Sequence, residues 1–379
     1  KGIIMLDILI LAAGKGTRMK SPLPKVLHPV AGVPMIKRVI DAVKDAGAKE
    51  IRAVVGFQKD LVRSMLEPYA VNCYAQLHQN GTADAVRAAQ PENMQGTVLI
   101  LNGDHPLLEA SDLKGILMEF HDLRADIAVV TAEMKNPGSL GRIVRGQGHL
   151  KAIVEASDAS SDTLKIREVN SGIYCVKAEV LAKFLPMISN ANAKGEYYLT
   201  DIISLGLENG AKVVAIKTKP KVAFGVNTQL ELAKATGLLF KRKRNELMEN
   251  GVLFIDPNST YVESDVKIGE STVVYPGTYI GGRTSIGRAC LIGPQCFISH
   301  SHLGDGVQLK SGTYIDNSVV NSRATLGPYA HLRPDTEIGP EAHVGNFVEM
   351  KKTKFGARAK AGHLTYLGDA EIGEDVNIG

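Results

Sequence analysis

Two patterns of apolar residues divide the chain. Up to about residue 228, short apolar runs alternate with stretches that repeat apolar residues every three to four positions. This alternation predicts a mostly parallel sheet with helices on both faces, a Rossmann-like α/β domain over residues 1–228. The expected strands are 7–11, 51–56, 97–104, 127–132 and 212–217, and the expected helices are 35–47, 60–67 and 111–123. Ligands of such sheets bind at the carboxyl ends of the strands.

A single long helix is predicted to link this domain to the rest of the chain. Residues 229–250 carry good helix formers at helical spacing, and a glycine follows them. The basic run "KRKR" at 241–244 is interpreted as a solvated helix face.

Beyond residue 251 the apolar period becomes six. A hexad of aliphatic residues with glycines between them is typical of a parallel β-helix, in which each short strand places one side chain in a stacked core. The positions are Ile268, Val274, Ile280, Ile286, Ile292 and Ile298, then Val320, Leu326, Leu332, Ile338, Val344 and Met350. Two steps shorten to five, at Leu303 and Val320, where we expect small bulges or loops.

The ends and sides of such a β-helix favour further contacts. Long flat sides suit packing into a trimer. Residues 251–379 stop at "EDVNIG" in mid-repeat, so we expect the natural β-helix to continue beyond Gly379.

Composition narrows the class of protein. A net charge of +4 over 379 residues is too small for an extended nucleic-acid surface. No apolar run approaches the ~18 residues of a membrane span, and the four cysteines show neither CxxC nor disulfide spacing. We therefore expect a cytoplasmic protein with neither nucleic acid nor membrane as partner, and any cationic site to be local.

The turn after the first strand has the character of an anion site. "AAGKGTRM" is not a Walker loop and lacks the third glycine of a dinucleotide motif. Its glycines let backbone N–H groups approach an anion, and cations follow within one turn. The prolines of "PLPKVL" restrict the approach of Lys25. A chain of phosphates fits this arrangement better than one carboxylate does, although a plain β-turn explains a Gly-Lys-Gly sequence equally well.

Asp104 follows a predicted strand and so lies at the same edge of the sheet as the glycine turn. One or two carboxylates together with substrate phosphates commonly hold Mg²⁺. A turn-capping role for Asp104 is the alternative, and we assign no role to His105.

Several motifs together resemble one family. "LAAGKGTRMKSPLPKVL" is similar to the motif of sugar-nucleotide pyrophosphorylases. The whole chain resembles the bifunctional N-acetylglucosamine-1-phosphate uridyltransferase and glucosamine-1-phosphate acetyltransferase family, GlmU, through "GEYYLTDI" (195–202), "GVNT" (225–228), "GNFVEMKK" (345–352) and "KAGHLTYLGDAEIG" (360–373). The resemblance implies a left-handed β-helix of hexapeptide repeats, a homotrimer, and two steps toward UDP-N-acetylglucosamine for peptidoglycan and lipopolysaccharide of the cell wall.

For the first domain, the resemblance implies transfer of UMP from UTP to N-acetylglucosamine 1-phosphate with Mg²⁺. Arg18 and Lys25 would be the catalytic cations, and Asp104 and Asn227 the metal ligands. The other implied nucleotide contacts are Leu11, Ala12, Ala13, Gly14, Gln76, Gly81, Thr82, Asn102 and Gly103. The implied sugar-phosphate contacts are Gly141, Glu155, Asn170 and Asn227, with Tyr198 and Thr200 nearby. A side-chain amide such as that of Gln76 offers both a donor and an acceptor to uracil.

For the β-helix, the resemblance implies acetylation of glucosamine 1-phosphate by acetyl-CoA. Arg333 and Lys351 would bind the phosphate, Tyr366 and Asn377 the sugar, and His363 would take the proton of the amine. Family members bind acetyl-CoA largely through later coils, so we expect residues 251–379 to hold only the sugar-phosphate half of this site. Two alternatives are another hexose-1-phosphate nucleotidyltransferase with a β-helix tail and a non-catalytic regulatory subunit of the same fold.

Overall fold

The computed structural model describes residues 6–379. Contacts divide the chain into two compact units, each described separately below. The first comprises the residues up to Val30 together with Pro34–Ala235, and the second comprises Ala31–Val33 and Thr236–Gly379.

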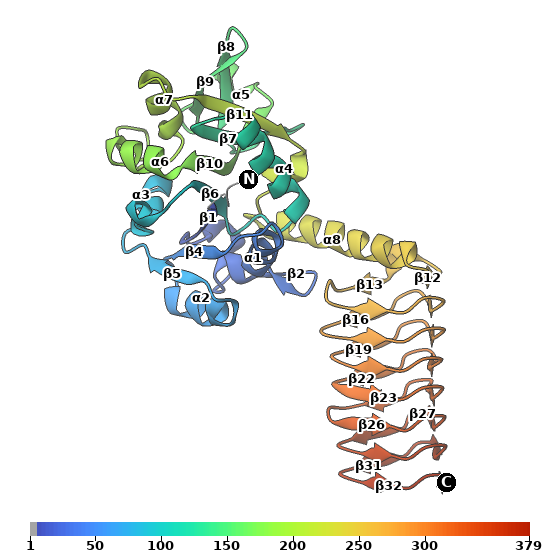
Figure 1. Cartoon of the computed structure of the whole chain (residues 1–379). Coiled ribbons are helices and arrows are strands. Elements are labelled where there is room, and N and C mark those ends of the chain that lie inside the picture. The colour runs from blue at the N-terminus through green and yellow to red at the C-terminus, as the bar shows by residue number, and fades with distance from the viewer. Residues whose placement is uncertain (1–5) are drawn as a thin grey trace. The chain divides into compact units, whose positions relative to one another are not determined.

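The first unit is built on a mostly parallel sheet (Figure 1). Its main strands run in the order β11-β7-β10-β6-β1-β4-β5, and only β10 is antiparallel to its neighbours β6 and β7. All five predicted strands are present, as β1, β4, β6, β7 and β11. The strand bounds are β1 Leu6–Ala12, β2 Pro29–Val30, β3 Val33–Pro34, β4 Glu50–Val55, β5 Asn72–Ala75, β6 Thr97–Asn102, β7 Ile127–Glu133, β8 Arg142–Gly146, β9 His149–Val154, β10 Glu168–Lys177 and β11 Val213–Thr218.

Helices cover both faces of this sheet. Because strand side chains alternate between faces, Ile8 and Ile10 of β1 join one apolar core and Leu9 joins the other. Helices α1 and α4 pack on the first core, and α3, α6 and α7 pack on the second. The helix bounds are α1 Met35–Asp45, α2 Lys59–Leu66, α3 Thr82–Ala88, α4 Ala110–Asp122, α5 Ser161–Leu164, α6 Ala178–Phe184 and α7 Asp201–Glu208. The predicted α/β class is confirmed.

The long helix is present as α8, Gln229–Glu249. It begins with a reciprocal cap, in which Glu231 accepts from the Thr228 N–H at 3.0 Å and the Glu231 N–H donates to Thr228 Oγ1 at 3.2 Å. The interpretation of residues 241–244 as a solvated face is wrong for two of the four. Lys243 and Arg244 are buried, and each has a partner: Lys243 pairs with Glu246 at 2.8 Å, and Arg244 donates to the Thr260 carbonyl at 2.9 Å.

The second unit is a β-helix of three parallel sheets (Figure 1). The first sheet is β12-β15-β18-β21-β24-β27-β30-β33, the second is β13-β16-β19-β22-β25-β28-β31, and the third is β14-β17-β20-β23-β26-β29-β32. All twelve hexad residues are buried in one continuous core. The predicted β-helix is thus confirmed.

Its strands are two to four residues long. Their bounds are β12 Leu253–Phe254, β13 Tyr261–Val262, β14 Lys267–Ile268, β15 Val273–Val274, β16 Tyr279–Gly281, β17 Ser285–Ile286, β18 Leu291–Ile292, β19 Phe297–Ser299, β20 His302–Leu303, β21 Gln308–Leu309, β22 Tyr314–Asp316, β23 Ser318–Val320, β24 Thr325–Leu326, β25 His331–Leu332, β26 Thr336–Ile338, β27 His343–Asn346, β28 Glu349–Lys351, β29 Lys354–Phe355, β30 Lys360–His363, β31 Tyr366–Gly368, β32 Glu371–Ile372 and β33 Asn377–Ile378.

The bulges or loops predicted at Leu303 and Val320 are wrong. Both short steps fall at the corner between the second and third sheets, and the strands beyond it stay in register, with Leu303 paired to Ile286 and to Val320. The turn at this corner is one residue shorter than a six-residue step requires. Another five-residue step lies at the same corner between Met350 and Phe355.

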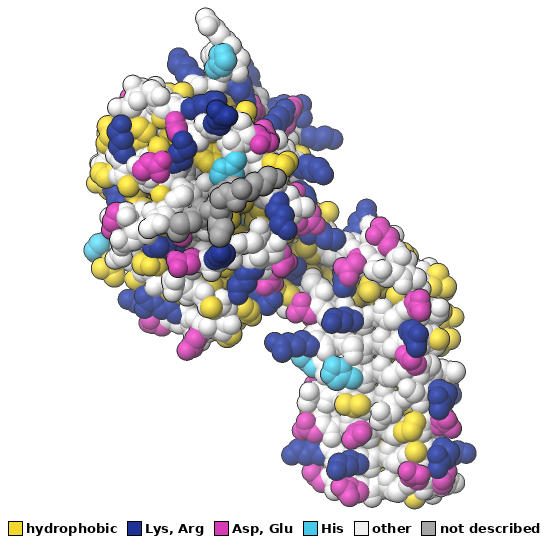
Figure 2. Space-filling model, in the orientation of Figure 1, with side chains coloured by type: hydrophobic (Ala, Val, Ile, Leu, Met, Phe, Trp, Pro, Cys, Tyr) yellow, Lys and Arg dark blue, Asp and Glu magenta, His cyan; other side chains and the backbone are white. Residues whose placement is uncertain are grey.

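Charged side chains are dispersed over the surface. On the face of the molecule in Figure 2, basic and acidic side chains are interspersed. Along the β-helix they pair between successive coils, as Arg323 does with Glu341 at 2.6 Å and Arg358 with Asp375 at 2.7 Å. Within residues 6–379, none of the helices combines the length and the apolar character needed to cross a bilayer.

Candidate functional site

The glycine turn after β1 holds the stem of Lys25. Gly16 has a φ of +61°, and a Cβ built on it would lie 2.6 Å from the Cβ of Lys25. Only glycine tolerates both the left-handed backbone and this approach. Lys25 itself begins a short 3₁₀ helix, Lys25–Leu27, directly after Pro24. The turn and the proline together place the ammonium group.

The ammonium of Lys25 contacts two oxygens from distant parts of the chain. It binds Asp104 Oδ2 and lies 3.0 Å from Asn227 Oδ1. Asp104 follows β6, and its carbonyl accepts the Val226 N–H at 2.9 Å, so the loop that carries Asn227 is fastened beside it. The structure therefore brings together the two residues that the family resemblance implies as metal ligands.

Burial and charge act on Asp104 in opposite directions. Burial raises the pKa of its carboxyl, whereas the charge of Lys25 and the hydrogen bond from it are among the effects that lower this pKa. The net pKa lies below the ordinary value, so the group is ionised. The neighbouring His105 is buried, and burial lowers its pKa, which keeps the ring neutral. Its Nε2 lies 3.6 Å from Asp104 Oδ1, an oxygen that accepts no hydrogen bond within the described part of the chain.

A first cavity of about 370 Å³ opens beside Lys25. It is lined by ten of the eleven residues predicted to bind nucleotide: Leu11, Ala12, Ala13, Gly14, Lys25, Gln76, Gly81, Thr82, Asn102 and Asp104. The exception is Gly103, which does not line the cavity and whose N–H donates to the Leu11 carbonyl at 2.9 Å. The sequence analysis did not single out Gln79 and Glu196, which also line the cavity. Gln79 lies between Gln76 and Gly81, both implied by the family resemblance, and Glu196 belongs to the family motif "GEYYLTDI"; these neighbours are the signal that could have found them.

The side-chain amide of Gln76 is already held by the protein. Its Nε2 donates to the Gly81 carbonyl at 3.1 Å and to Asp84 Oδ2 at 2.7 Å. Both amide protons are thereby used, so the amide offers a ligand its oxygen only. We expected the Gln76 amide to offer uracil both a donor and an acceptor, but only the acceptor remains.

Gly81 lets the segment 195–202 approach the first cavity. A Cβ on Gly81, whose φ is +114°, would lie 2.5 Å from the Tyr197 carbonyl oxygen. That carbonyl accepts the Ala83 N–H at 2.9 Å, and Thr82 Oγ1 accepts the Leu199 N–H at 2.9 Å. The segment is thus fastened to the start of α3.

A second cavity of about 340 Å³ adjoins the first. It is lined by Gly141, Glu155, Asn170 and Asn227, all predicted to bind the sugar phosphate, and by Thr200 and Arg18. Tyr198 is not part of its lining. The two cavities share Leu11, Thr82, Asn102 and Asp104. The carboxylate of Asp104 therefore lies where they meet, and Arg18 borders the second cavity rather than the first.

Polar groups of the second cavity are preorganised by the sheet. Asn170 Oδ1 accepts the Gly172 N–H at 2.8 Å, and its Nδ2 donates to the Tyr174 hydroxyl at 2.7 Å. One N–H and one lone pair of this amide remain for a ligand. Burial raises the pKa of Glu155 above its ordinary value, and Lys194 opposes this shift.

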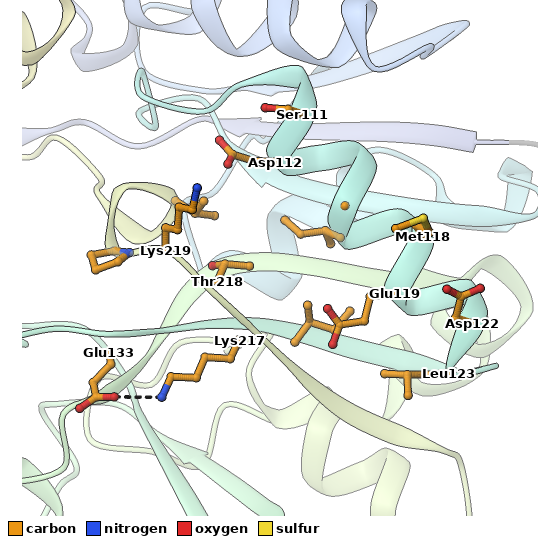
Figure 3. Close-up of a pocket in the computed structure, with 15 residues that line it drawn as sticks. Ser111, Asp112, Met118, Glu119, Asp122, Leu123, Glu133, Lys217, Thr218 and Lys219 are labelled. Carbon is orange, nitrogen blue, oxygen red and sulfur yellow. Dashed lines mark hydrogen bonds and ion pairs between the residues drawn. The ribbon is translucent and has the colours of Figure 1, made fainter. Parts of the chain in front are cut away.

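A larger hollow lies elsewhere on the first unit, between α4 and β11 (Figure 3). It has a volume of about 860 Å³, and none of the predicted site residues lines it. Its rim carries the Lys217–Glu133 pair, at 2.9 Å. The volume of a cavity therefore does not identify the candidate substrate site in this unit.

The β-helix arranges the five residues predicted for acetyl transfer along two sheets. Arg333, Lys351 and Tyr366 lie on successive coils of the second sheet, where the Arg333 N–H donates to the Met350 carbonyl at 2.8 Å and Lys351 pairs with Gly368. Arg333 Nη1 is bound to Glu349 at 2.9 Å. His363 ends β30 of the first sheet, near the corner that leads to Tyr366.

Asn377 is not brought close to this group. It pairs with Lys360 at the opposite end of β30 from His363, three residues or roughly 10 Å away along the strand. His363, Tyr366 and Asn377 are all exposed.

Comparisons with known proteins agree with these features. Residues 8–165 match the model of the MobA-like NTP transferase domain, and residues 262–355 match that of the GMPPB C-terminal domain. The chain is 61% identical to the bifunctional protein GlmU of Bdellovibrio bacteriovorus, over 99% of this chain and 82% of that protein. It is 43% identical to GlmU of Pelobacter propionicus, over 98% of this chain and 82% of the relative.

A solved structure resembles the fold. It is a protein of Bacillus anthracis assigned as a glucose-1-phosphate thymidylyltransferase, with a TM-score of 0.50 and 21% identity over 62% of this chain and 94% of that chain. This likeness concerns the fold alone.

Proposed function

Because the chain belongs to the GlmU family of bifunctional transferases, we propose that residues 1–228 transfer UMP from UTP to N-acetylglucosamine 1-phosphate and that residues 251–379, beyond the 229–250 helix, serve acetyl transfer. The products of the first reaction are UDP-N-acetylglucosamine and pyrophosphate. The observation that carries this proposal is the meeting of two cavities at Asp104. One holds a nucleotide, the other a sugar phosphate, and their junction is the place for the α-phosphorus.

The uridyl transfer needs no general base. A sugar 1-phosphate is anionic at neutral pH, so its oxygen attacks the α-phosphorus directly while the bond to pyrophosphate breaks. The protein must bring two polyanions together and neutralise them. Lys25 lines the nucleotide cavity and Arg18 lines the sugar-phosphate cavity, so each substrate has its own cation. Loss of either cation is expected to raise the barrier by about 2–4 kcal/mol.

The residues around Lys25 suit Mg²⁺. A carboxylate oxygen of Asp104 and an amide oxygen of Asn227 converge on one cationic group, the ammonium itself, and oxygen ligands with few carboxylates are typical of magnesium sites. Among residues 6–379 no cluster of three His, Cys, Asp or Glu side chains could hold a metal, which agrees with a site completed by substrate phosphates. When bound, Mg²⁺ supplies charge neutralisation at the phosphates.

Recognition of the two substrates is divided between the cavities. We assign the N3–H of uracil to Gln76 Oε1, since the Gln76 amide protons are used by Gly81 and Asp84. The hydroxyl and acetamido groups of the sugar are assigned to Glu155 and Asn170.

For the acetyl transfer, Arg333 and Lys351 are assigned to the phosphate of glucosamine 1-phosphate and Tyr366 to its sugar. The amine attacks the thioester carbonyl of acetyl-CoA and one amine proton passes to His363; the C–S bond then breaks, and the thiolate of coenzyme A takes that proton and leaves as the thiol. Asn377 fits a sugar contact less well, since it lies at the far end of β30. Assembly into a homotrimer through the β-helix is supported by the apolar side chains exposed along it, such as Tyr329, Phe347 and Leu364.

A pyrophosphate-release assay tests the uridyl transfer and separates it from the alternative nucleotidyltransferase. UTP with N-acetylglucosamine 1-phosphate should be the best pair among UTP, ATP and dTTP combined with N-acetylglucosamine 1-phosphate or glucose 1-phosphate. A preference for dTTP or ATP with glucose 1-phosphate would overturn the proposal. A thiol-release assay with acetyl-CoA and glucosamine 1-phosphate tests the second activity, and sedimentation equilibrium tests the trimer.

A further inference from the structure

The ammonium of Lys25 occupies the position between Asp104 and Asn227 that a metal ion would take. It contacts Asp104 Oδ2 and lies 3.0 Å from Asn227 Oδ1. The other carboxylate oxygen, Oδ1, is buried and turned toward the ring of His105 at 3.6 Å. A cation that bridges Asp104 and Asn227 through their facing oxygens must therefore displace the ammonium.

We propose that Lys25 is a resident counter-ion of the magnesium site, which keeps the metal out until a polyphosphate draws the ammonium away. This inference rests on the proposed uridyltransferase function, and it adds to the phosphate-binding role of Lys25 a second role toward Asp104. The lysine thereby makes binding of metal and binding of nucleotide mutually dependent.

The charge of Lys25 both stabilises Asp104 and disfavours a metal ion beside it. Asp104 is buried, and an ionised carboxylate without a partner is strongly disfavoured there. Lys25 supplies that partner. A divalent ion at the same carboxylate would stand next to the ammonium and be repelled by it, so the two cations exclude each other.

A nucleotide in the first cavity would offer the ammonium of Lys25 another anionic partner. Lys25 lines the first cavity together with the backbone of residues 11–14, so a triphosphate bound there offers it anionic oxygens. Its backbone and Cβ are fixed by the close approach of Gly16, which leaves the outer part of the side chain to exchange partners. Because coupling between two ligands is reciprocal, nucleotide and metal each favour binding of the other.

The test is a titration of the nucleotide-free full chain with Mn²⁺, a spectroscopic substitute for Mg²⁺, followed by electron paramagnetic resonance. Lys25→Gln removes the charge and keeps a polar side chain. It should bind Mn²⁺ at least about tenfold more tightly than the wild-type protein. Lys20→Gln, which changes an exposed lysine of the same segment, should bind as the wild type does. The double variant Lys25→Gln/Asp104→Asn should lose the gain, which locates the ion.

Thermal unfolding gives a second readout that does not depend on turnover. Lys25→Gln leaves Asp104 unpaired, so its Tm should fall, and Mn²⁺ should restore it while leaving the wild-type Tm unchanged. Lys25→Met serves as a second variant if Lys25→Gln does not fold. Equal Mn²⁺ affinity in the wild-type and Lys25 variants overturns the counter-ion role even if uridyl transfer is observed. Tight Mn²⁺ binding by Lys25→Gln supports that role even if the uridyl-transfer assay fails.

Discussion

The amide nitrogen of Gln76 donates a 2.7 Å hydrogen bond to the carboxylate of Asp84, eight residues further along the chain. Together with the bond to the Gly81 carbonyl, this contact fixes which end of the amide faces the first cavity. The oxygen is left for the ligand. A pyrimidine with a donor at N3 is therefore favoured over one with an acceptor there.

Removing the carboxylate should weaken this selection. In Asp84→Asn the amide of Gln76 can present either end, so we expect kcat/KM for UTP to fall roughly tenfold, the equivalent of one hydrogen bond of about 1.4 kcal/mol. The ratio of UTP to CTP turnover should fall as well. Pyrophosphate release with each nucleotide measures both, and Asp45→Asn, an exposed change on α1, is the control. An unchanged UTP to CTP ratio would exclude this role of Asp84.

Gly81 is expected to be much less replaceable than Gly195. A Cβ at Gly81, whose φ is +114°, would meet the Tyr197 carbonyl at 2.5 Å, whereas Gly195, whose φ is +67°, has open space around it. Gly195→Ala should cost about 1 kcal/mol from backbone strain alone, which lowers the Tm of a unit of this size by about 3 °C. Gly81→Ala should lower it by at least twice that and raise the KM for UTP. Equal shifts in calorimetry would contradict the close-packing argument.

The cap of α8 should position the loop that carries Asn227, the proposed metal ligand. Glu231 Oε2 accepts the N–H groups of Asn227, at 2.8 Å, and Thr228, at 3.0 Å. Glu231→Ala removes both acceptors, and we expect a loss of about 1 kcal/mol and a several-fold higher Mg²⁺ concentration for half-maximal activity. Glu249→Ala, at the exposed end of the same helix, should change neither quantity. If Glu231→Ala loses stability with no change in Mg²⁺ requirement, the cap does not position Asn227.

Glu155 should make stability depend on pH in a defined direction. Burial raises its pKa above 4.5 in the folded chain. The unfolded chain therefore releases the proton more readily, so this contribution to stability is present below pH 4.5 and is lost as pH rises through the folded pKa. Glu155→Gln should unfold at a higher temperature than the wild type at pH 8, and the difference should vanish in acid. A Tm difference independent of pH would show that Glu155 is not desolvated.

Much of the fold followed from residue periodicity. The apolar runs at 7–11 and 51–56 matched β1 and β4 within one residue at each end, because strands buried on both faces are continuously apolar. The hexads placed Ile280 and Leu332 in the core correctly, since one inward residue per short strand leaves a strict period. The antiparallel strand β10 was not anticipated, because its pairing depends on partners far away in sequence.

The sequence predicted which residues line the site, but it predicted less well which hydrogen bonds they make. Family motifs indicated Gln76 and Asn170, yet the sequence could not reveal that Asp84 and Tyr174 already bind their amides. Burial of Arg244 was missed for the same reason, since its acceptor, the Thr260 carbonyl, is supplied by tertiary packing. The one-residue shortening at Leu303 was visible, but only the paired strands show that the corner absorbs it.

The proposed uridyl transfer depends most on the assignment of the two cavities that meet at Asp104, and a crystal structure of the chain soaked with UDP-N-acetylglucosamine and Mg²⁺ tests this assignment directly. The predicted result is uridine beside Gln76 and Gly81, the diphosphate at Lys25 and Asp104, and the sugar beside Glu155 and Asn170. Density for the nucleotide sugar in the hollow between α4 and β11, with the cavities at Asp104 empty, would contradict it.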